Sequence, residues 1–153
     1  MEDAAVREDL ALASLFGGLC LANSGLGAVH GLAAAAGARL SAPHGAVCAA
    51  VLTASVEVNL EALRARAPED PALSKLTDLA GLLTGQPRAR PEDVIVWLQQ
   101  LTTALAIPGL AHYGLDPTEI GTLVTAAQQA SSMKANPIVL TDGEVSDIVR
   151  RSL

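Results

Sequence analysis

Two histidines, His30 and His44, constrain the fold of this chain more than any other feature. They stand fourteen residues apart in a stretch of small residues that runs from Gly25 to Gly45. On one continuous helix they would lie about 21 Å apart. To share a metal ion, each imidazole nitrogen must lie about 2.0–2.1 Å from it. The chain must then turn back between them. Gly37 can end one helix and Pro43 can open another.

The residues alone leave two interpretations of these histidines open. Both can bind one metal ion, for which Fe²⁺, Zn²⁺ and Mn²⁺ are all chemically admissible partners of imidazole. Alternatively, one histidine packs between helices and the other caps a helix or lies in a loop. The second interpretation requires no convergence of the rings.

Apolar residues repeat at helical spacing through the chain, and start and stop signals divide it into helices. No alternating segment long enough for a strand occurs, so we predict an all-α fold. The first predicted helix is apolar nearly all round, which is typical of a central buried helix. The predicted helices begin near residue 4 or 6, before His30, at 43 or 44, after the break at 68–71, after Pro91, at 117 and after 141. An interruption at Gly25 and Gly27 separates the first two, the second to fourth end at about Gly37, Ala67 and Gly85, and the sixth runs to about Ala130.

Composition limits the possible functions. The chain has 153 residues, enough for one domain with a substantial core. Only 2% of residues are aromatic, so the helices must pack through Ala, Leu, Val and Gly. The net charge of −6 and the lack of a basic cluster argue against binding to nucleic acid. The amino-terminal residues lack the positive region of a secretory signal, and two cysteines suggest no disulfide framework. We therefore expect a cytoplasmic protein.

A membrane helix is the alternative for the uncharged stretch from Leu10 to Ala38. Gly27 and Gly31 in this stretch have the spacing of a helix-pairing motif. Six glycines and the polar residues Asn23 and His30 interrupt the apolar surface, however, and no positive flank sets an orientation. We expect a buried core helix and no membrane association.

Three motifs occur in order along the chain: G-A-V-H-G-L-A around His30, A-P-H-G-A-V-C-A-A-V-L around His44, and S-S-M-K-A-N-P-I-V-L-T-D-G-E near the end. From about Glu8 to Leu153 the sequence resembles the C-terminal helical domain of iron-containing (group III) alcohol dehydrogenases. The resemblance implies a multi-helix bundle of the dehydroquinate synthase-like α-domain type. It also implies a single metal-binding domain, residues 1–153, in which His30 and His44 bind a divalent ion, Fe²⁺ or Zn²⁺.

The resemblance further implies an NAD(P)-dependent oxidoreductase that interconverts an alcohol and an aldehyde or ketone. In that family an N-terminal nucleotide-binding domain supplies an Asp, a further His and the cofactor site. This chain shows no glycine-rich dinucleotide motif, since Gly25-x-Gly27 lies in a helix-like stretch. We therefore expect that domain to be absent, and to be the natural partner of a chain that is inactive alone. A homo-oligomer, in which a second copy of this chain is the partner, is a further option.

Other site assignments from the resemblance are weaker. Leu21 and Ser132 correspond to positions near the family's substrate pocket, although either residue can equally serve packing or a helix end. Many family members have a second histidine four residues after the first, and here that position is Ala34. The resemblance therefore gives this chain no catalytic residue, and its cofactor-binding residues stay unknown.

Three alternative functions stay open. Cys48 follows His44 by four residues, on the same helix face, so it could complete a self-contained zinc site, with Cys20 and His112 as further candidates. The other interpretation of both thiols is packing in an apolar core. The chain could instead be a non-enzymatic helical interaction module. It could also be a relative of the maleylacetate reductases or glycerol dehydrogenases.

Overall fold

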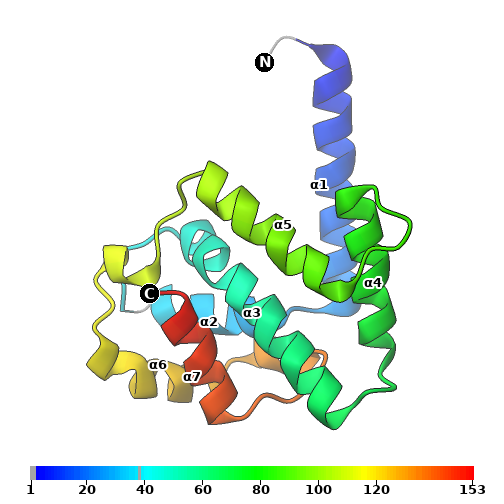
Figure 1. Ribbon diagram of the computed structural model, residues 1–153. Coiled ribbons are helices and arrows are strands. Elements are labelled where there is room, and N and C mark those ends of the chain that lie inside the picture. Colours follow the sequence, from blue (N-terminus) through cyan, green and yellow to red (C-terminus); the bar gives the residue numbers. More distant parts are fainter. Residues whose placement is uncertain (1–2, 38) are drawn as a thin grey trace.

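The fold is all-helical, as the sequence predicts. A computed structural model describes residues 3–37 and 39–153, and these contain seven α-helices and no strand (Figure 1). The α-helices are α1 (Ala4–Ser24), α2 (Ala28–Gly37), α3 (His44–Arg66), α4 (Pro71–Thr84), α5 (Pro91–Ala104), α6 (Ile120–Gln128) and α7 (Asp142–Arg151). Three 3-10 turns join them: η1 (Leu110–Tyr113), η2 (Pro117–Glu119) and η3 (Ser131–Ala135).

Local capping interactions set the helix ends. Gly85 ends α4 in the left-handed conformation, with φ of 68°, which a residue without Cβ adopts at little cost. At the start of α7 the Glu144 amide donates to Thr141 Oγ1 at 3.2 Å, and Glu144 Oε2 accepts from the Thr141 amide at 2.7 Å. These reciprocal bonds satisfy amides that the first turn of a helix leaves unpaired. The helix boundaries therefore follow from the local sequence.

The core forms around α2 and α3. Small side chains such as Ala33 and Ala36 let α2 approach both α3 and α6 closely, and α7 closes the other side of α3. Fully buried α3 residues include Val47, Val51 and Leu63. A second, smaller cluster of Ala80, Ala89, Val94 and Leu98 joins α4 to α5. Burial on several sides accounts for the apolar length of α3, which by length and composition alone would suffice to cross a membrane.

The expectation that the first helix is buried is wrong. No residue of α1 is buried, and the helix extends away from the rest of the molecule at the top of Figure 1. Its axis is bent by 96° from that of α2, so the uncharged stretch forms two helices instead of one. The apolar composition of α1 indicates that another apolar surface should cover it. It does not indicate whether that surface belongs to the same domain or to another part of a protein.

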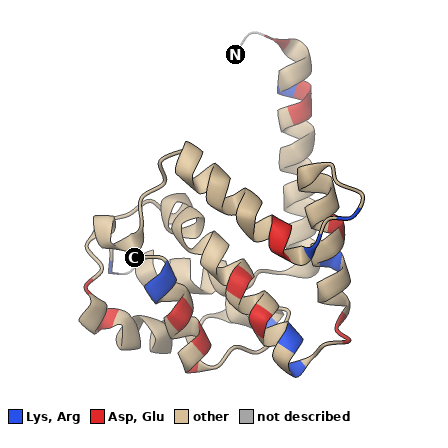
Figure 2. Ribbon diagram, viewed as in Figure 1, with Lys and Arg blue, Asp and Glu red and all other residues tan. Residues whose placement is uncertain are grey.

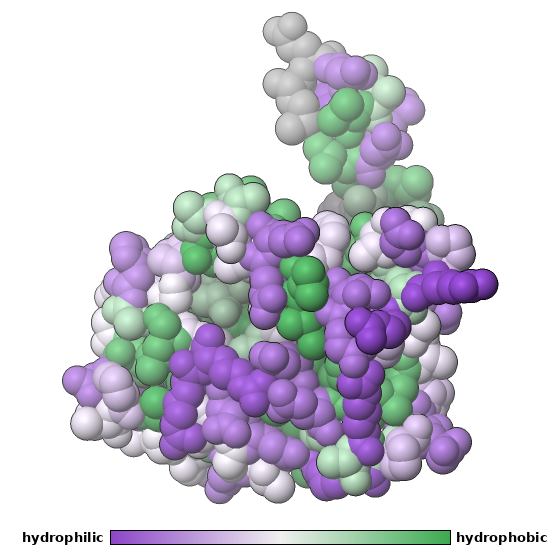
Figure 3. Space-filling model, viewed as in Figure 1, coloured by the Kyte–Doolittle hydropathy of each residue, from purple (hydrophilic) through white to green (hydrophobic). Residues whose placement is uncertain are grey.

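Seven large apolar side chains on α1 are exposed to 42–58%. They are Val6, Leu10, Leu12, Leu15, Phe16, Leu19 and Leu21. The charged residues of this helix gather near its amino-terminal end, and apolar surface covers much of the rest (Figures 2 and 3). Apolar surfaces of this kind are typical of interaction sites with proteins or membranes.

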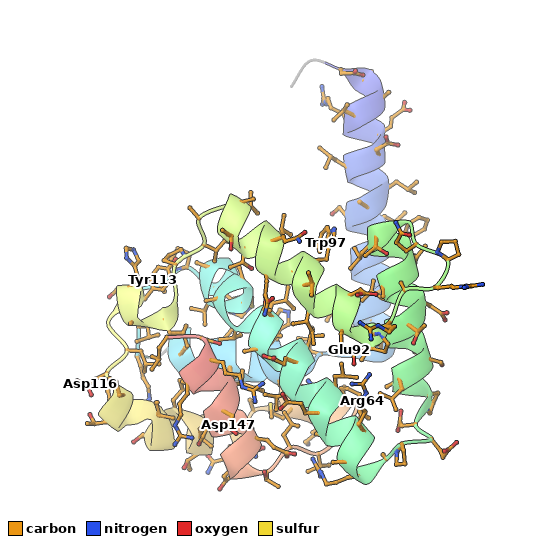
Figure 4. The ribbon with its side chains drawn as sticks, viewed as in Figure 1. Arg64, Glu92, Trp97, Tyr113, Asp116 and Asp147 are labelled. Atoms are coloured by element: carbon orange, nitrogen blue, oxygen red, sulfur yellow. The ribbon has the colours of Figure 1, made fainter. Side chains whose placement is uncertain are left out.

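Ion pairs at the surface hold α3 against its neighbours. Arg151 of α7 contacts Glu57 at 3.0 Å and Glu61 at 2.9 Å, both on α3. Arg64 of α3 pairs with Glu92 of α5, as Figure 4 shows. The hydrogen bond from Arg64, supported by a backbone bond, holds the pKa of Glu92 below its usual value. Exposed pairs contribute about 0–1 kcal/mol each, so they align the helices more than they stabilise the fold.

Asn136 links three segments that lie far apart in the sequence. Its Oδ1 accepts from the Ala28 amide at 3.0 Å, at the first residue of α2. Its Nδ2 donates to Asn59 Oδ1 of α3 at 2.6 Å and to the Ile138 carbonyl at 2.8 Å. A Cβ at Gly27 would lie 2.8 Å from Asn136 Oδ1, so this amide fits only against a glycine. Asn136 therefore fixes where α2 begins.

We expect Asn136→Ala to lower the free energy of unfolding by about 2–3 kcal/mol, because it removes the hydrogen bonds of the Asn136 amide and leaves half-buried partners unpaired. Urea denaturation measures the change. Asn23→Ala is the matched control, since Asn23 is exposed and bonds only within its own helix at Leu19. The control should change stability by less than about 0.5 kcal/mol. Equal effects of the two substitutions would contradict the linking role of Asn136.

Candidate metal centre

His30 and His44 each lie close to the amino-terminal end of a helix. His30 is in the first turn of α2, which Asn136 holds at Ala28. His44 is the first residue of α3 and follows Pro43, the residue that caps that helix. Cys48 lies one turn further along α3, next to the buried Val47. The three side chains therefore come from two helices whose start points are fixed.

The structure brings these three side chains together. His30 Nδ1 lies 3.2 Å from His44 Nε2. Cys48 Sγ lies 3.5 Å from His44 Nε2 and 3.9 Å from His30 Nδ1. The ring centroids of the two histidines are 5.3 Å apart, with planes inclined by 35°. The two rings thus direct one nitrogen each at a common point that also faces the sulfur.

The surroundings of this cluster are partly apolar. His44 is exposed, whereas His30 and Cys48 are half-buried at the edge of the main core. Burial raises the pKa of the Cys48 thiol, and a backbone hydrogen bond opposes that rise. Without a metal, one ring can donate an N–H to the other at the observed distance. One side of the cluster stays open to solvent.

The donor set fits a divalent first-row ion. Two imidazole nitrogens and a sulfur lie within 4.8 Å of one another, a separation that one ion can span. Imidazole binds zinc and iron well, and a thiolate binds zinc strongly. The open side leaves room for a further ligand, as catalytic zinc sites require.

The other predicted residues lie outside this cluster. Leu21 is exposed on α1, and Ser132 is half-buried in η3. Cys20 is also exposed on α1, and His112 is exposed in η1, where its ring meets Tyr113 edge-on. The substrate-lining roles of Leu21 and Ser132 stay predictions.

Two positioning features were not predicted from the sequence. Asn136 belongs to the closing motif, whose pattern does not indicate the link to α2 that the structure shows. Gly31, next to His30, lies so close to η3 that a Cβ there would meet Met133 Sδ at 2.5 Å and Met133 Cγ at 2.8 Å. The only sequence signal for this close approach was the glycine itself. Together these contacts set the position of His30.

Comparison with known proteins gives a consistent result over the whole chain. Residues 1–153 match the family model described as Fe-containing alcohol dehydrogenase family, C-terminal. Alcohol dehydrogenase 4 of Schizosaccharomyces pombe is 31% identical over 99% of this chain and 34% of its own length. Alcohol dehydrogenase 4 of Saccharomyces cerevisiae is 29% identical over 99% of this chain and 38% of its own length. The chain thus spans little more than a third of the curated relatives that it matches.

Solved structures share the fold. A crystal structure of 1,3-propanediol oxidoreductase superposes with a TM-score of 0.82 and 28% identity, over 99% of this chain and 39% of the other. An archaeal halo-thermophilic alcohol dehydrogenase from a Red Sea brine pool gives a TM-score of 0.84, again over 99% of this chain and 39% of the other. Its identity of 23% shows the shared fold alone.

Proposed function

The chain belongs to the Fe-containing alcohol dehydrogenase family, of which it matches the C-terminal part, and from this premise we propose that it is the metal-binding helical part of an oxidoreductase. The reaction is the interconversion of an alcohol and an aldehyde or ketone. The observation that carries the proposal is the convergence of His30 Nδ1 and His44 Nε2 at 3.2 Å. The matched motif around each histidine, in the predicted order, supports it.

In this proposal His30 and His44 bind a divalent ion, Fe²⁺ or Zn²⁺. When bound, the ion supplies Lewis-acid stabilisation of negative charge on a substrate oxygen, worth several kcal/mol. The chain's own residues hold and orient the ligands: Asn136 and Gly31 position α2, and the buried Val47 anchors the first turns of α3. The apolar core behind the histidines keeps water from one side of the site.

The remaining parts of the enzyme lie, we propose, outside these residues. The chain covers only 34–38% of its fungal relatives, so a whole relative has more than half of its length elsewhere. We propose that a nucleotide-binding domain binds NAD(P), supplies further metal ligands and covers α1. The exposed apolar surface of α1 supports such a partner. The acidic net charge and the two free thiols support a cytoplasmic protein that does not bind nucleic acid.

A second candidate is a non-enzymatic interaction module that uses the same α1 surface. Seven large apolar side chains on one exposed helix favour association with another protein chain, including a second copy. The two candidates differ in whether the histidines bind a metal. The following experiments separate them.

Addition of Zn²⁺ at a hundred times its dissociation constant should stabilise the chain by about 2.7 kcal/mol, raising Tm by about 5–10 °C. Thermal unfolding in chelator-treated buffer measures this shift. His30→Ala and His44→Ala should each remove most of it. His112→Ala is the matched control, because His112 is exposed and lies outside the cluster. A shift that persists in His44→Ala would contradict the proposed metal ligands.

The isolated chain should show negligible turnover of simple alcohols or aldehydes with NAD(H) or NADP(H), even when loaded with Fe²⁺ or Zn²⁺. The reason is that the cofactor site belongs to the proposed nucleotide-binding domain. Absorbance of the reduced nicotinamide measures the rate. Robust turnover that depends on His30 would refute the proposed division of labour.

The α1 surface should cause concentration-dependent self-association when no partner covers it. Light scattering after size exclusion measures the mass. Leu15→Lys and Phe16→Lys should shift the chain toward monomer, because each places a charge in the apolar surface. Leu82→Lys is the control, since Leu82 is 83% exposed on α4. A strict monomer at high concentration would argue against α1 as a docking surface.

A further inference from the structure

We propose that Cys48 is a third ligand of the metal ion, so that this chain carries a two-nitrogen, one-sulfur donor set that binds Zn²⁺ by itself. The inference rests on the proposed function, because His30 and His44 are the ligands proposed there. It adds a ligand that the family resemblance does not supply.

The distances in the cluster match those of a tetrahedral zinc site. With Zn–N bonds of about 2.0–2.1 Å and Zn–S bonds of about 2.3 Å, two nitrogens lie about 3.3–3.4 Å apart and each lies about 3.6 Å from the sulfur. The structure gives 3.2 Å between His30 Nδ1 and His44 Nε2. It gives 3.5 Å and 3.9 Å from Cys48 Sγ to these nitrogens. Shifts of a few tenths of an ångström would complete the geometry.

The helices hold these donors in place. His44 and Cys48 are four residues apart, so both side chains lie on one face of α3. Val47 and Val51, on the same two turns, are fully buried and prevent this face from rotating. His30 approaches from α2, whose position Gly31 and Asn136 fix. His44 and Cys48 on α3, together with His30 on α2, therefore occupy three corners of a tetrahedron.

His44 is exposed, so solvent can reach an ion held by these three donors at its fourth position. A water molecule fills this position in the isolated chain. In the whole enzyme the further ligands of the proposed nucleotide-binding domain replace it, and the ion then has more than four ligands. Binding requires that the Cys48 thiol lose its proton to solvent as the sulfur–metal bond forms. No oxidation or reduction takes place.

A thiolate ligand also affects which metal is selected. Sulfur donors favour Zn²⁺, whereas Mn²⁺ and Mg²⁺ prefer oxygen. With Cys48 in the site, the chain should bind Zn²⁺ much more tightly than Mn²⁺. Without Cys48, the two histidines should bind zinc more weakly and discriminate less.

The test compares metal binding by the full chain with that of three variants. Co²⁺ serves as the spectroscopic probe, since a cobalt–thiolate bond gives a charge-transfer band in the near ultraviolet. Competition with a chromogenic chelator measures Zn²⁺ affinity. The variants are Cys48→Ser, His44→Ala and the matched control Cys20→Ser, which removes the exposed thiol on α1. X-ray absorption at the zinc edge of the unmodified chain reports directly on a sulfur neighbour.

We expect one ion per chain, a charge-transfer band, and zinc–sulfur scattering at about 2.3 Å. Cys48→Ser should remove the band and weaken Zn²⁺ binding on the order of 100-fold. Cys20→Ser should retain both signals. His44→Ala should weaken binding as well, since it removes a nitrogen donor.

Four results would overturn the inference. If Cys48→Ser binds Zn²⁺ as tightly as the unmodified chain, and His44→Ala does not, the two histidines bind metal without the thiol and only this inference fails. If the unmodified chain binds no metal, the proposed function fails with it. If binding requires Cys20, or if one ion binds per two chains, the ion is held between two molecules and not within one chain. Zinc-edge scattering without sulfur decides against Cys48 even if the variants unfold.

Discussion

The position of α2 depends on close contacts that its small residues allow, and the candidate site depends on α2. This helix has ten residues, most of them alanine or glycine. Gly31 lies against Met133, and the amide at Ala28 donates to Asn136. The backbone of α2 therefore lies directly against two side chains of the segment 131–136, those of Met133 and Asn136. Because His30 is in the first turn of α2, any shift of this helix moves the His30 ring relative to His44 and Cys48.

The rest of the core follows the same principle of close packing by small residues. With 2% aromatic residues, burial depends on the number of contacts between Ala, Leu and Val and not on a few large rings. Helix α3 is the most extensively packed helix, because α2, α5 and α7 all contact it. Helix α1 is the exception, because its apolar surface has no cover among the described residues. That contrast fits a helical part that works in contact with another domain.

The site combines this rigid frame with an open side. Two helices supply donors from their first turns, where the backbone is well anchored, and His44 faces solvent. Metal sites of this kind hold an ion firmly while leaving a position for a substrate or a further ligand. The proposed Lewis-acid role of a bound ion requires both properties.

The sequence determined the elements of this protein because their signals are local. Gly85 and the Thr141–Glu144 capping box act within a few residues, and apolar periodicity marks each helix. The spacing of His30 and His44 also required a turn between them if both were to meet one ion.

Only the tertiary structure decided which side chains meet. It placed Asn136 on Ala28, 108 residues away in the sequence, and Cys48 near His30 from a different helix. It also left α1 exposed, although its composition predicts burial. Such contacts depend on how helices pack, and packing energy is a sum over many distant residues that no local pattern contains.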